Sequence, residues 1–165
     1  MPHPEAAALL AFLDQAYDKR SWHGPNLRGS LRGLDIAEAS FRPGPDRHNI
    51  WELAVHSAYW KYAVLRRLTG EKRGSFPLEG SNWFTRPGGE ATPAAFRADL
   101  ALLGEMHERL REAVAALDPR HLGERPRGTK FSTREIVFGA AAHDLYHAGQ
   151  IQLLKRMYRS GRVSR

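Results

Sequence analysis

The sequence predicts an all-α protein: a four-helix bundle with long crossover connections, formed by residues 1–165 as a single domain. Four segments carry apolar residues at the three- and four-residue spacing of a helix, and none shows the alternation of a half-buried strand. A chain of 165 residues with 42% hydrophobic content is long enough to bury one core. It contains no cysteine, which excludes disulfides, iron–sulfur clusters, cysteine-based zinc sites and a cysteine nucleophile.

The first two helices are predicted at about residues 4–20 and 49–68. Pro4 is favourable in the first turn of a helix, where the N–H that proline lacks would have no partner within the helix. Asn49 and Glu52 resemble a capping box at the start of the second helix, with asparagine in place of the usual serine or threonine. Each segment therefore has a start signal in addition to its apolar spacing.

The third and fourth helices are predicted at about residues 92–117 and 132–158. Thr92 is a favourable cap and is followed directly by proline, which suits the first helical position. Ser132 and Glu135 form a complete capping box. The four segments together hold roughly 90 residues, the scale of a four-helix bundle.

Two connections are much longer than a helical hairpin needs, residues 21–48 and residues 71–91, and both are rich in glycine and proline. Connections of this length can run from one end of a bundle to the other, and we expect both to do so. Each carries a tryptophan, Trp22 or Trp83, which favours a packed loop. The two tryptophans are therefore candidate walls of a pocket.

The net charge of +7 is concentrated at the C-terminus, where residues 155–165 contain five basic and no acidic side chains. The rest of the chain has a net charge of only +2. A basic tail complements the negative end of the preceding helix and is usually solvated; an anionic partner such as nucleic acid is the alternative. With no apolar run near the ~20 residues of a membrane span and no basic leader, a cytoplasmic protein is expected.

The last predicted helix contains two histidines, His143 and His147, whose four-residue spacing lets both imidazoles converge on one metal ion. They belong to the apolar stripe of that helix, whose other members are Ile136, Ala140, Ile151 and Leu154. His56 lies in a matching stripe of the second helix, with Leu53, Trp60 and Val64. The three histidines are predicted to bind one metal, the alternative being histidines that are hydrogen-bonded within the core.

The depths of the histidines permit a common site. His56 lies ~10 Å from the start of its helix, and the midpoint of His143 and His147 lies ~18 Å from the start of theirs. The rings are expected to meet if the two helices run parallel with a stagger of a turn or two. Because a histidine must be neutral to coordinate, metal retention is expected to weaken below pH ~6.

Residues near the histidines allow several interpretations. Glu52 lies one turn before His56 and either orients its ring or is an ordinary solvated glutamate. Trp60 lies one turn after it and either walls a pocket or belongs to the core. Asp144 and Tyr146 point to other faces of their helix and are assigned no role. The remaining histidines are predicted to be surface, cap or loop residues: His3, His23, His48, His107 and His121.

Two sequence motifs are excluded on inspection. His143 to His147 resembles the zinc-protease signature with aspartate in place of the catalytic glutamate, but no His, Asp or Glu follows as the downstream ligand. Residues 123–130 resemble a phosphate-binding loop, but Thr129 precedes Lys130 and no strand leads into the loop.

Three sequence blocks resemble the DinB superfamily of metal-binding four-helix bundles: SWHGP at residues 21–25, HNIWELAVHSAYW at 48–60 and HDLYHAGQI at 143–151. In that family a histidine of the second helix and two of the fourth hold a divalent metal. The residues of this chain that match them are His56, His143 and His147. The resemblance also implies the bundle fold and a homodimer.

Three neutral imidazoles suit zinc or nickel foremost, with iron or copper as alternatives, and they leave coordination positions open. An enzyme acting on a small molecule is therefore expected, and the resemblance implies a low-molecular-weight-thiol S-transferase. A metal-dependent hydrolase or isomerase is the alternative. A basic nucleic-acid-binding bundle or a non-catalytic metal-stabilised bundle is the alternative of another class. The catalytic residues remain unassigned.

Overall fold

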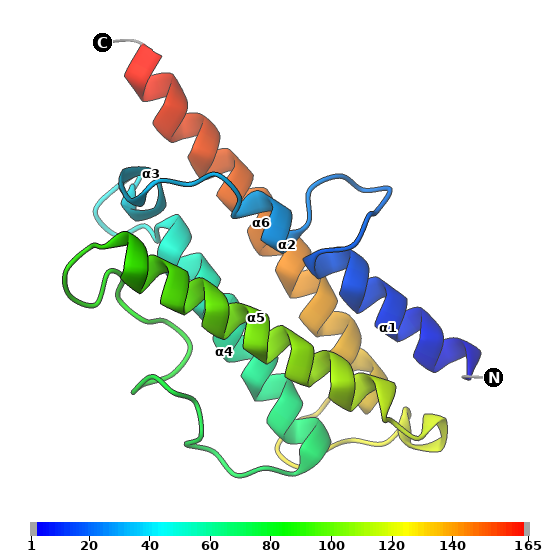
Figure 1. The fold of residues 1–165 in the computed structure, drawn as a ribbon. Helices are drawn as coiled ribbons and strands as arrows, with labels where there is room; N and C mark the ends of the chain where they lie inside the picture. Colours follow the sequence, from blue (N-terminus) through cyan, green and yellow to red (C-terminus); the bar gives the residue numbers. More distant parts are fainter. Residues whose placement is uncertain (1–2, 164–165) are drawn as a thin grey trace.

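A computed structural model describes residues 3–163, and the ends of the predicted domain, residues 1–2 and 164–165, lie outside the described part. The described chain is helical without strands, which confirms the all-α prediction (Figure 1). Its four long helices are α1 (Pro4–Tyr17), α4 (Ile50–Thr69), α5 (Pro93–Ala115) and α6 (Thr133–Val163). Short helices α2 (Leu27–Ser30) and α3 (Ile36–Ser40) and a 3-10 turn (Pro119–His121) lie between them.

The long helices form two parallel pairs that run in opposite directions (Figure 1). Contacts between equivalent ends show the pairing: Glu5 and Arg134 join the starts of α1 and α6, with Nε and Oε1 2.8 Å apart. Trp51 packs on Phe96 at the starts of α4 and α5. Helices α4 and α6 are antiparallel neighbours. The site discussed below lies between them.

The connection from α4 to α5 runs back along the whole of α4, as expected for a crossover. The Tyr62 hydroxyl accepts hydrogen bonds from the backbone N–H groups of Gly74 and Ser75, at 3.1 and 3.2 Å. Near the other end of α4, Glu52 accepts one from the backbone N–H of Arg86, at 3.1 Å. This connection is thus tied to α4 through hydrogen bonds at both ends.

The connection from α1 to α4 does not cross the bundle, contrary to the prediction. It folds at one end, where α2 and α3 are capped by the side chains of Asn26 and Asp35. Trp22 is fully exposed, so the predictions of a packed side chain and of a pocket wall are both wrong for this residue. The physical reason is that two short capped helices satisfy this segment's backbone without the tryptophan as an anchor.

The caps read from the sequence form at three helix starts. The side chains of Asn49, Thr92 and Ser132 each accept a hydrogen bond from a backbone N–H three residues ahead. Glu135 completes its capping box by accepting from the backbone N–H of Ser132, at 2.7 Å. Glu52 does not complete the other box, because its carboxylate is engaged elsewhere. Helix α1 ends at Tyr17, earlier than predicted.

Helix α6 continues to Val163, beyond its predicted end, so the described part of the basic segment is helical. Lys155 is buried, and its Nζ donates to the backbone carbonyls of Ser30 and Arg32, at 3.0 and 3.1 Å. Arg159 forms an ion pair with Glu38. These two basic residues hold α2 and α3 against α6, which corrects the interpretation of this segment as a solvated tail. Its last basic residue lies outside the described part of the chain.

Among the described residues, two groups of buried apolar side chains make up the core. One centres on α4 and α5 and includes Trp51, Leu103 and Ile151; the other centres on α1 and α6 and includes Leu13 and Val137. Among the described helices, none is both long and apolar enough to cross a membrane.

Candidate metal centre

His56 of α4 and His143 and His147 of α6 come together between the two helices. The Nε2 atom of His143 lies 3.1 Å from that of His56 and 3.0 Å from that of His147. All three potential ligand atoms lie within 4.8 Å of one another. His56 and His147 are buried, and His143 is partly buried. The sequence-predicted group is therefore assembled, with a spacing that could hold one metal ion.

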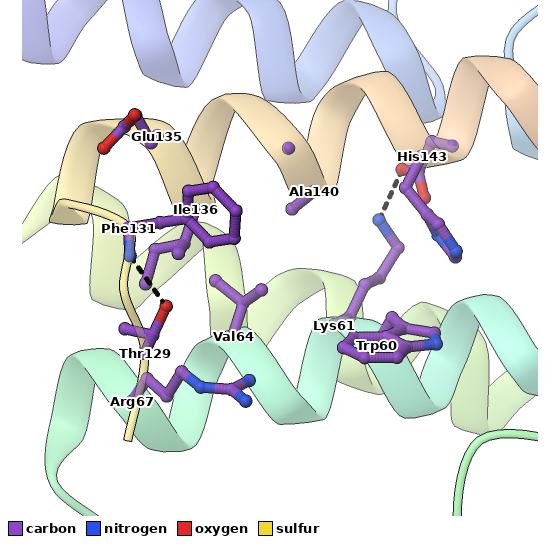
Figure 2. A pocket seen from close by; sticks show the side chains of 12 residues that line it. Trp60, Lys61, Val64, Arg67, Thr129, Phe131, Glu135, Ile136, Ala140 and His143 are labelled. Atoms are coloured by element: carbon purple, nitrogen blue, oxygen red, sulfur yellow. Dashed lines mark hydrogen bonds and ion pairs between the residues drawn. The ribbon is translucent and has the colours of Figure 1, made fainter. Parts of the chain in front are cut away.

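The helices bring the histidines together in an antiparallel arrangement, which corrects the parallel one considered from the sequence. His56 lies about 20 Å before the end of α4, and the midpoint of the α6 pair lies about 18 Å after the start of α6. Because the end of α4 is level with the start of α6 (Figures 1 and 2), these two depths coincide without a stagger. The path of the crossover between α4 and α5 determines the relative direction of α4 and α6. The length of this connection alone does not show which path it takes.

The tautomer of His56 is fixed by the loop that follows α4. Its Nδ1 lies 2.8 Å from the backbone carbonyl of Asn82, which can only accept, so Nδ1 carries the proton. The Nε2 atom that faces the other histidines is therefore a bare acceptor. Asn82 has a left-handed backbone, with φ of 64°, and its side-chain oxygen accepts from the Trp60 indole at 2.9 Å. Trp60 thus helps to hold the carbonyl that orients His56.

His147 has a comparable partner on its own helix. Its Nδ1 lies 2.6 Å from Oε1 of Gln150, one turn further along. Histidine ligands of metals characteristically use one ring nitrogen for the metal and the other for such an orienting hydrogen bond. Because bare ring nitrogens about 3 Å apart repel each other unless a proton or a cation lies between them, this arrangement suits a bound cation.

Burial keeps the three rings neutral at pH 7. Desolvation lowers the pKa of His56 to about 4 and the pKa of His143 to about 3, and it also lowers the pKa of His147. A neutral imidazole has the lone pair that coordination requires. The donor set therefore fits a divalent transition metal without any prior loss of protons.

Trp83 covers the outer side of His56. Its ring stacks on His56 at a centroid distance of 3.7 Å and on His48, on its other face, at 3.5 Å. Trp83 is 36% exposed, but its ring is packed between the two histidines, which agrees with the prediction of a packed loop. His48 is a partly exposed loop residue, as predicted, but it also takes part in this stack.

Glu52 has no hydrogen bond to His56 in the described structure and is not a solvated glutamate, so both interpretations from the sequence are wrong. It is buried and accepts hydrogen bonds from Arg42, from Nδ1 of His48 at 2.9 Å and from the backbone N–H of Arg86 at 3.1 Å. Burial by itself would raise the pKa of Glu52, but these hydrogen bonds hold it below its usual range. Glu52 therefore holds the loop between α4 and α5 in place, and this loop carries Asn82 and Trp83, two residues in contact with His56.

We predict that Glu52→Gln lowers the free energy of unfolding by about 1–3 kcal/mol, because the charged acceptor at the centre of this network is lost. The lowered pKa of Glu52 gives the sign of the pH dependence: its contribution is present above the unfolded value of 4.5 and is lost as the pH falls further. Urea unfolding at pH 7 and at lower pH measures both effects. Glu105→Gln, on the exposed face of α5, is the matched control, and equal stabilities of the two variants would contradict the prediction.

Sequence reasoning missed a buried ion pair next to the histidines. Lys61 and Asp144 are each 1% exposed, and Nζ of Lys61 donates to Oδ2 of Asp144. A lysine within the otherwise apolar sequence of α4 was the one sign in the sequence that a charged group is buried there.

His107 was predicted to be at the surface or in a loop, but it is buried and stacked on Tyr17 at 3.7 Å. Helix α1 covers α5 at His107, and the spacing of apolar residues in α5 alone did not indicate this contact.

A pocket of about 450 Å³ lies beside the histidines, between α4 and α6. His143 and Trp60 line one end of it (Figure 2). Trp60 is partly buried, lines this pocket and also packs against the core group of α4 and α5, so the structure bears out both of its sequence interpretations. The candidate centre therefore has a mainly apolar hollow directly next to one of its potential ligands.

The fold and the site define an all-α bundle in which histidines of two antiparallel helices meet in a candidate metal centre. A family model of the DinB superfamily matches residues 20–151, a span that includes all three histidines. The chain belongs to the DinB superfamily, which confirms the resemblance seen in the sequence. No curated protein and no solved structure matches the chain.

Proposed function

We propose that His56, His143 and His147 hold one divalent transition metal, and that the protein is a metal-dependent enzyme acting on a small molecule. The activity that we propose first is an S-transferase reaction, in which a low-molecular-weight thiol is joined through its sulfur to an electrophilic substrate. The observation that carries the proposal is the convergence of three neutral ring nitrogens beside a pocket. Family membership agrees with metal binding.

The ligand set favours zinc or nickel, with iron or copper as alternatives, because imidazole nitrogen suits these ions better than magnesium or calcium. When bound, such a metal supplies a Lewis acid with open positions for a thiolate or a water molecule. With three neutral ligands, the protein leaves the ion's charge uncompensated, which favours an anionic thiolate as a further ligand.

The residues of this chain position and shield the reactants. Trp83 covers one side of the cluster, and the Asn82 carbonyl keeps the His56 ring in place. In the transfer, the thiol loses its proton to solvent, its sulfur bonds to an electrophilic carbon, and the leaving group departs with the electrons of the broken bond. Glu52 and Asp144 are both engaged by cations, so neither is assigned as the base.

The test combines metal analysis with thiol consumption. Protein purified without a histidine tag is expected to contain about one metal ion per chain. With cobalt in the site, a small thiol is expected to change the visible spectrum, and thiol is expected to be consumed in the presence of a chloroaromatic electrophile. His143→Ala should abolish both effects, whereas His121→Ala, at an exposed position, should retain them. A loaded protein without either effect would overturn the transferase proposal.

The pKa values move the expected acid limit of metal binding below the value inferred from the sequence. Protons compete with the metal only where the folded histidines titrate, about 4 for His56 and about 3 for His143. Because the pKa of His147 is also below its ordinary value, we expect the metal to be retained below pH ~6 and lost as the pH falls towards ~4, measured as metal content after dialysis at each pH. Half-loss near the ordinary histidine value of 6.5 would contradict a buried, preformed site.

Hydrolysis or isomerisation at the same centre is the second candidate, since the open positions accept water as well as thiolate. A nucleic-acid-binding bundle is less favoured, because Lys155 and Arg159 of the basic segment are engaged within the protein. A non-catalytic metal-stabilised bundle is distinguished by the activity test above. The homodimer and the cytoplasmic location remain predictions.

A further inference from the structure

The pocket beside His143 is apolar along its length and has a charged group at its far end. Val64 of α4 and Ile136 and Ala140 of α6 form its walls, and Phe131 lies at the end opposite Trp60 and His143 (Figure 2). Phe131 is 60% exposed, although it is a large apolar side chain next to an apolar hollow. An apolar ligand in the pocket would cover part of this ring and gain its burial.

Arg67 stands at the same end as Phe131 and lacks a carboxylate partner among the described residues. Its Nη1 donates to the backbone carbonyl of Ala63 at 2.9 Å, while its Nε is buried without a hydrogen-bond partner. Burial, together with the charges of Arg66 and Arg73, lowers the pKa of Arg67. A buried donor without an acceptor is costly, so this guanidinium is well suited to receive an anion.

The surroundings of Arg67 are basic. A second hollow, of about 640 Å³, shares Arg67 with the pocket. Its charged lining residues are Arg66, Arg67, Lys72, Arg73, Arg127 and Glu71. The single acidic member, Glu71, already pairs with Arg109. This end of the pocket therefore attracts anions.

The two carboxylates within the pocket do not offset this charge. Asp144 is paired with Lys61. Glu135 accepts hydrogen bonds from the backbone N–H and hydroxyl of Ser132 and keeps its negative charge, which is outweighed by the basic residues around Arg67. Arg67 is thus the charged group left for a ligand. Its Nε is buried and its Nη1 is engaged by Ala63, so a carboxylate would be bound through the second terminal nitrogen, a charged donor for which the structure shows no hydrogen bond among the described residues.

We propose that this pocket binds an amphipathic carboxylate, with its carboxylate on Arg67 and its apolar body extending along Ile136 and Ala140 towards His143. The carbonyl that holds Arg67 belongs to Ala63, which lies about 10 Å along α4 from His56. The apolar body is therefore of medium length, as in an eight- to ten-carbon fatty acid or an arylalkanoic acid. That this carboxylate is the small-molecule substrate rests on the proposed function; that the pocket binds it does not.

Calorimetric titration with octanoate, decanoate and 4-phenylbutyrate tests the binding. Acetate, which lacks the apolar body, and octanol, which lacks the charge, are each expected to bind at least about tenfold more weakly. Arg67→Gln should weaken carboxylate binding by about tenfold or more and leave octanol binding unchanged. Arg97→Gln, on the exposed surface of α5, is the control for the loss of one positive charge.

A second variant blocks the pocket without removing a charge. Gly139 lines the pocket, and a Cβ added there would meet no atom within 4 Å, so Gly139→Leu is expected to fold. It should abolish binding of the medium-length carboxylates. Gly161→Leu, at a similarly open position near the end of α6, is the matched control. Equal carboxylate affinity of wild type and Gly139→Leu would overturn the proposal.

The titrations distinguish this proposal from the metal-centre proposal. Wild-type protein from which a chelator has removed the metal should bind carboxylate with about the affinity of the untreated protein. Carboxylate binding that is lost on chelation and unaffected by Arg67→Gln would place the carboxylate on the metal and overturn this proposal. Intact carboxylate binding by a protein that takes up no metal would support the pocket and overturn the proposed function instead.

Discussion

Alanine in place of His56, His143 or His147 is expected to lower metal content from about one ion per chain to less than about a tenth of that. Each residue supplies one of only three protein ligands, and the ring nitrogens are already within 4.8 Å of one another. Removing one leaves two imidazoles and at least one more position for water, so the ion dissociates during dialysis. Elemental analysis of the purified variants measures the effect.

Thermal unfolding gives an independent measure of the same site. Because a ligand that binds only the folded state stabilises it, added zinc or nickel should raise the melting temperature of wild type and not of the three variants. His121→Ala, at an exposed position in the 3-10 turn, should behave as wild type in both measurements. If each of the three variants kept its full metal content, the ligand assignment would be wrong.

The assembly of the histidines could be predicted from sequence because all three occupy apolar stripes of long helices. A buried stripe must face another helix, so a histidine in it is carried into the bundle interior. The direction of packing was not predictable in the same way. It depends on the path of the connection between α4 and α5, which returns along α4 through contacts of Tyr62 and Glu52.

The surroundings of the histidines were less predictable than the histidines themselves. Asn82 orients His56 through a backbone carbonyl, and its left-handed conformation has no simple signature in a non-glycine residue. Trp83 was recognised as a packed residue, but its position between His48 and His56 depends on that same loop. Such details follow from tertiary structure, whereas helix spacing is local.

The burial of Asp144 could not be predicted from the apolar spacing of its helix, for a different reason. It directly follows His143 and so points about 100° away around the helix, a direction that the apolar stripe assigns to solvent. Helix α6, however, packs against both α1 and α4, so more than one side of it is buried. The buried negative charge of Asp144 is paired with the ammonium group of Lys61, which lies on α4.

The Lys61–Asp144 pair leads to the largest expected effect on stability. Lys61→Met is expected to lower the free energy of unfolding by about 3–5 kcal/mol, because it leaves a carboxylate buried without its cation. Oδ1 of Asp144 already lacks a hydrogen-bond partner, so no second donor is in place to take over. Asp144→Leu should destabilise by a similar amount, since it strands the ammonium group.

The double variant Lys61→Met/Asp144→Leu is expected to recover most of this loss, because two apolar side chains of similar volume need no partners. Urea unfolding at pH 7 measures the free energies of this double-mutant cycle. The proteins are metal-free, so that binding of a metal to the neighbouring His143 does not contribute. Asp14 and Arg111, a pair nearer the surface, provide the comparison, and Arg111→Ala should cost no more than about 1 kcal/mol. Additive losses in the double variant, or single losses as small as those of the surface pair, would show that Lys61 and Asp144 do not depend on each other in the folded protein.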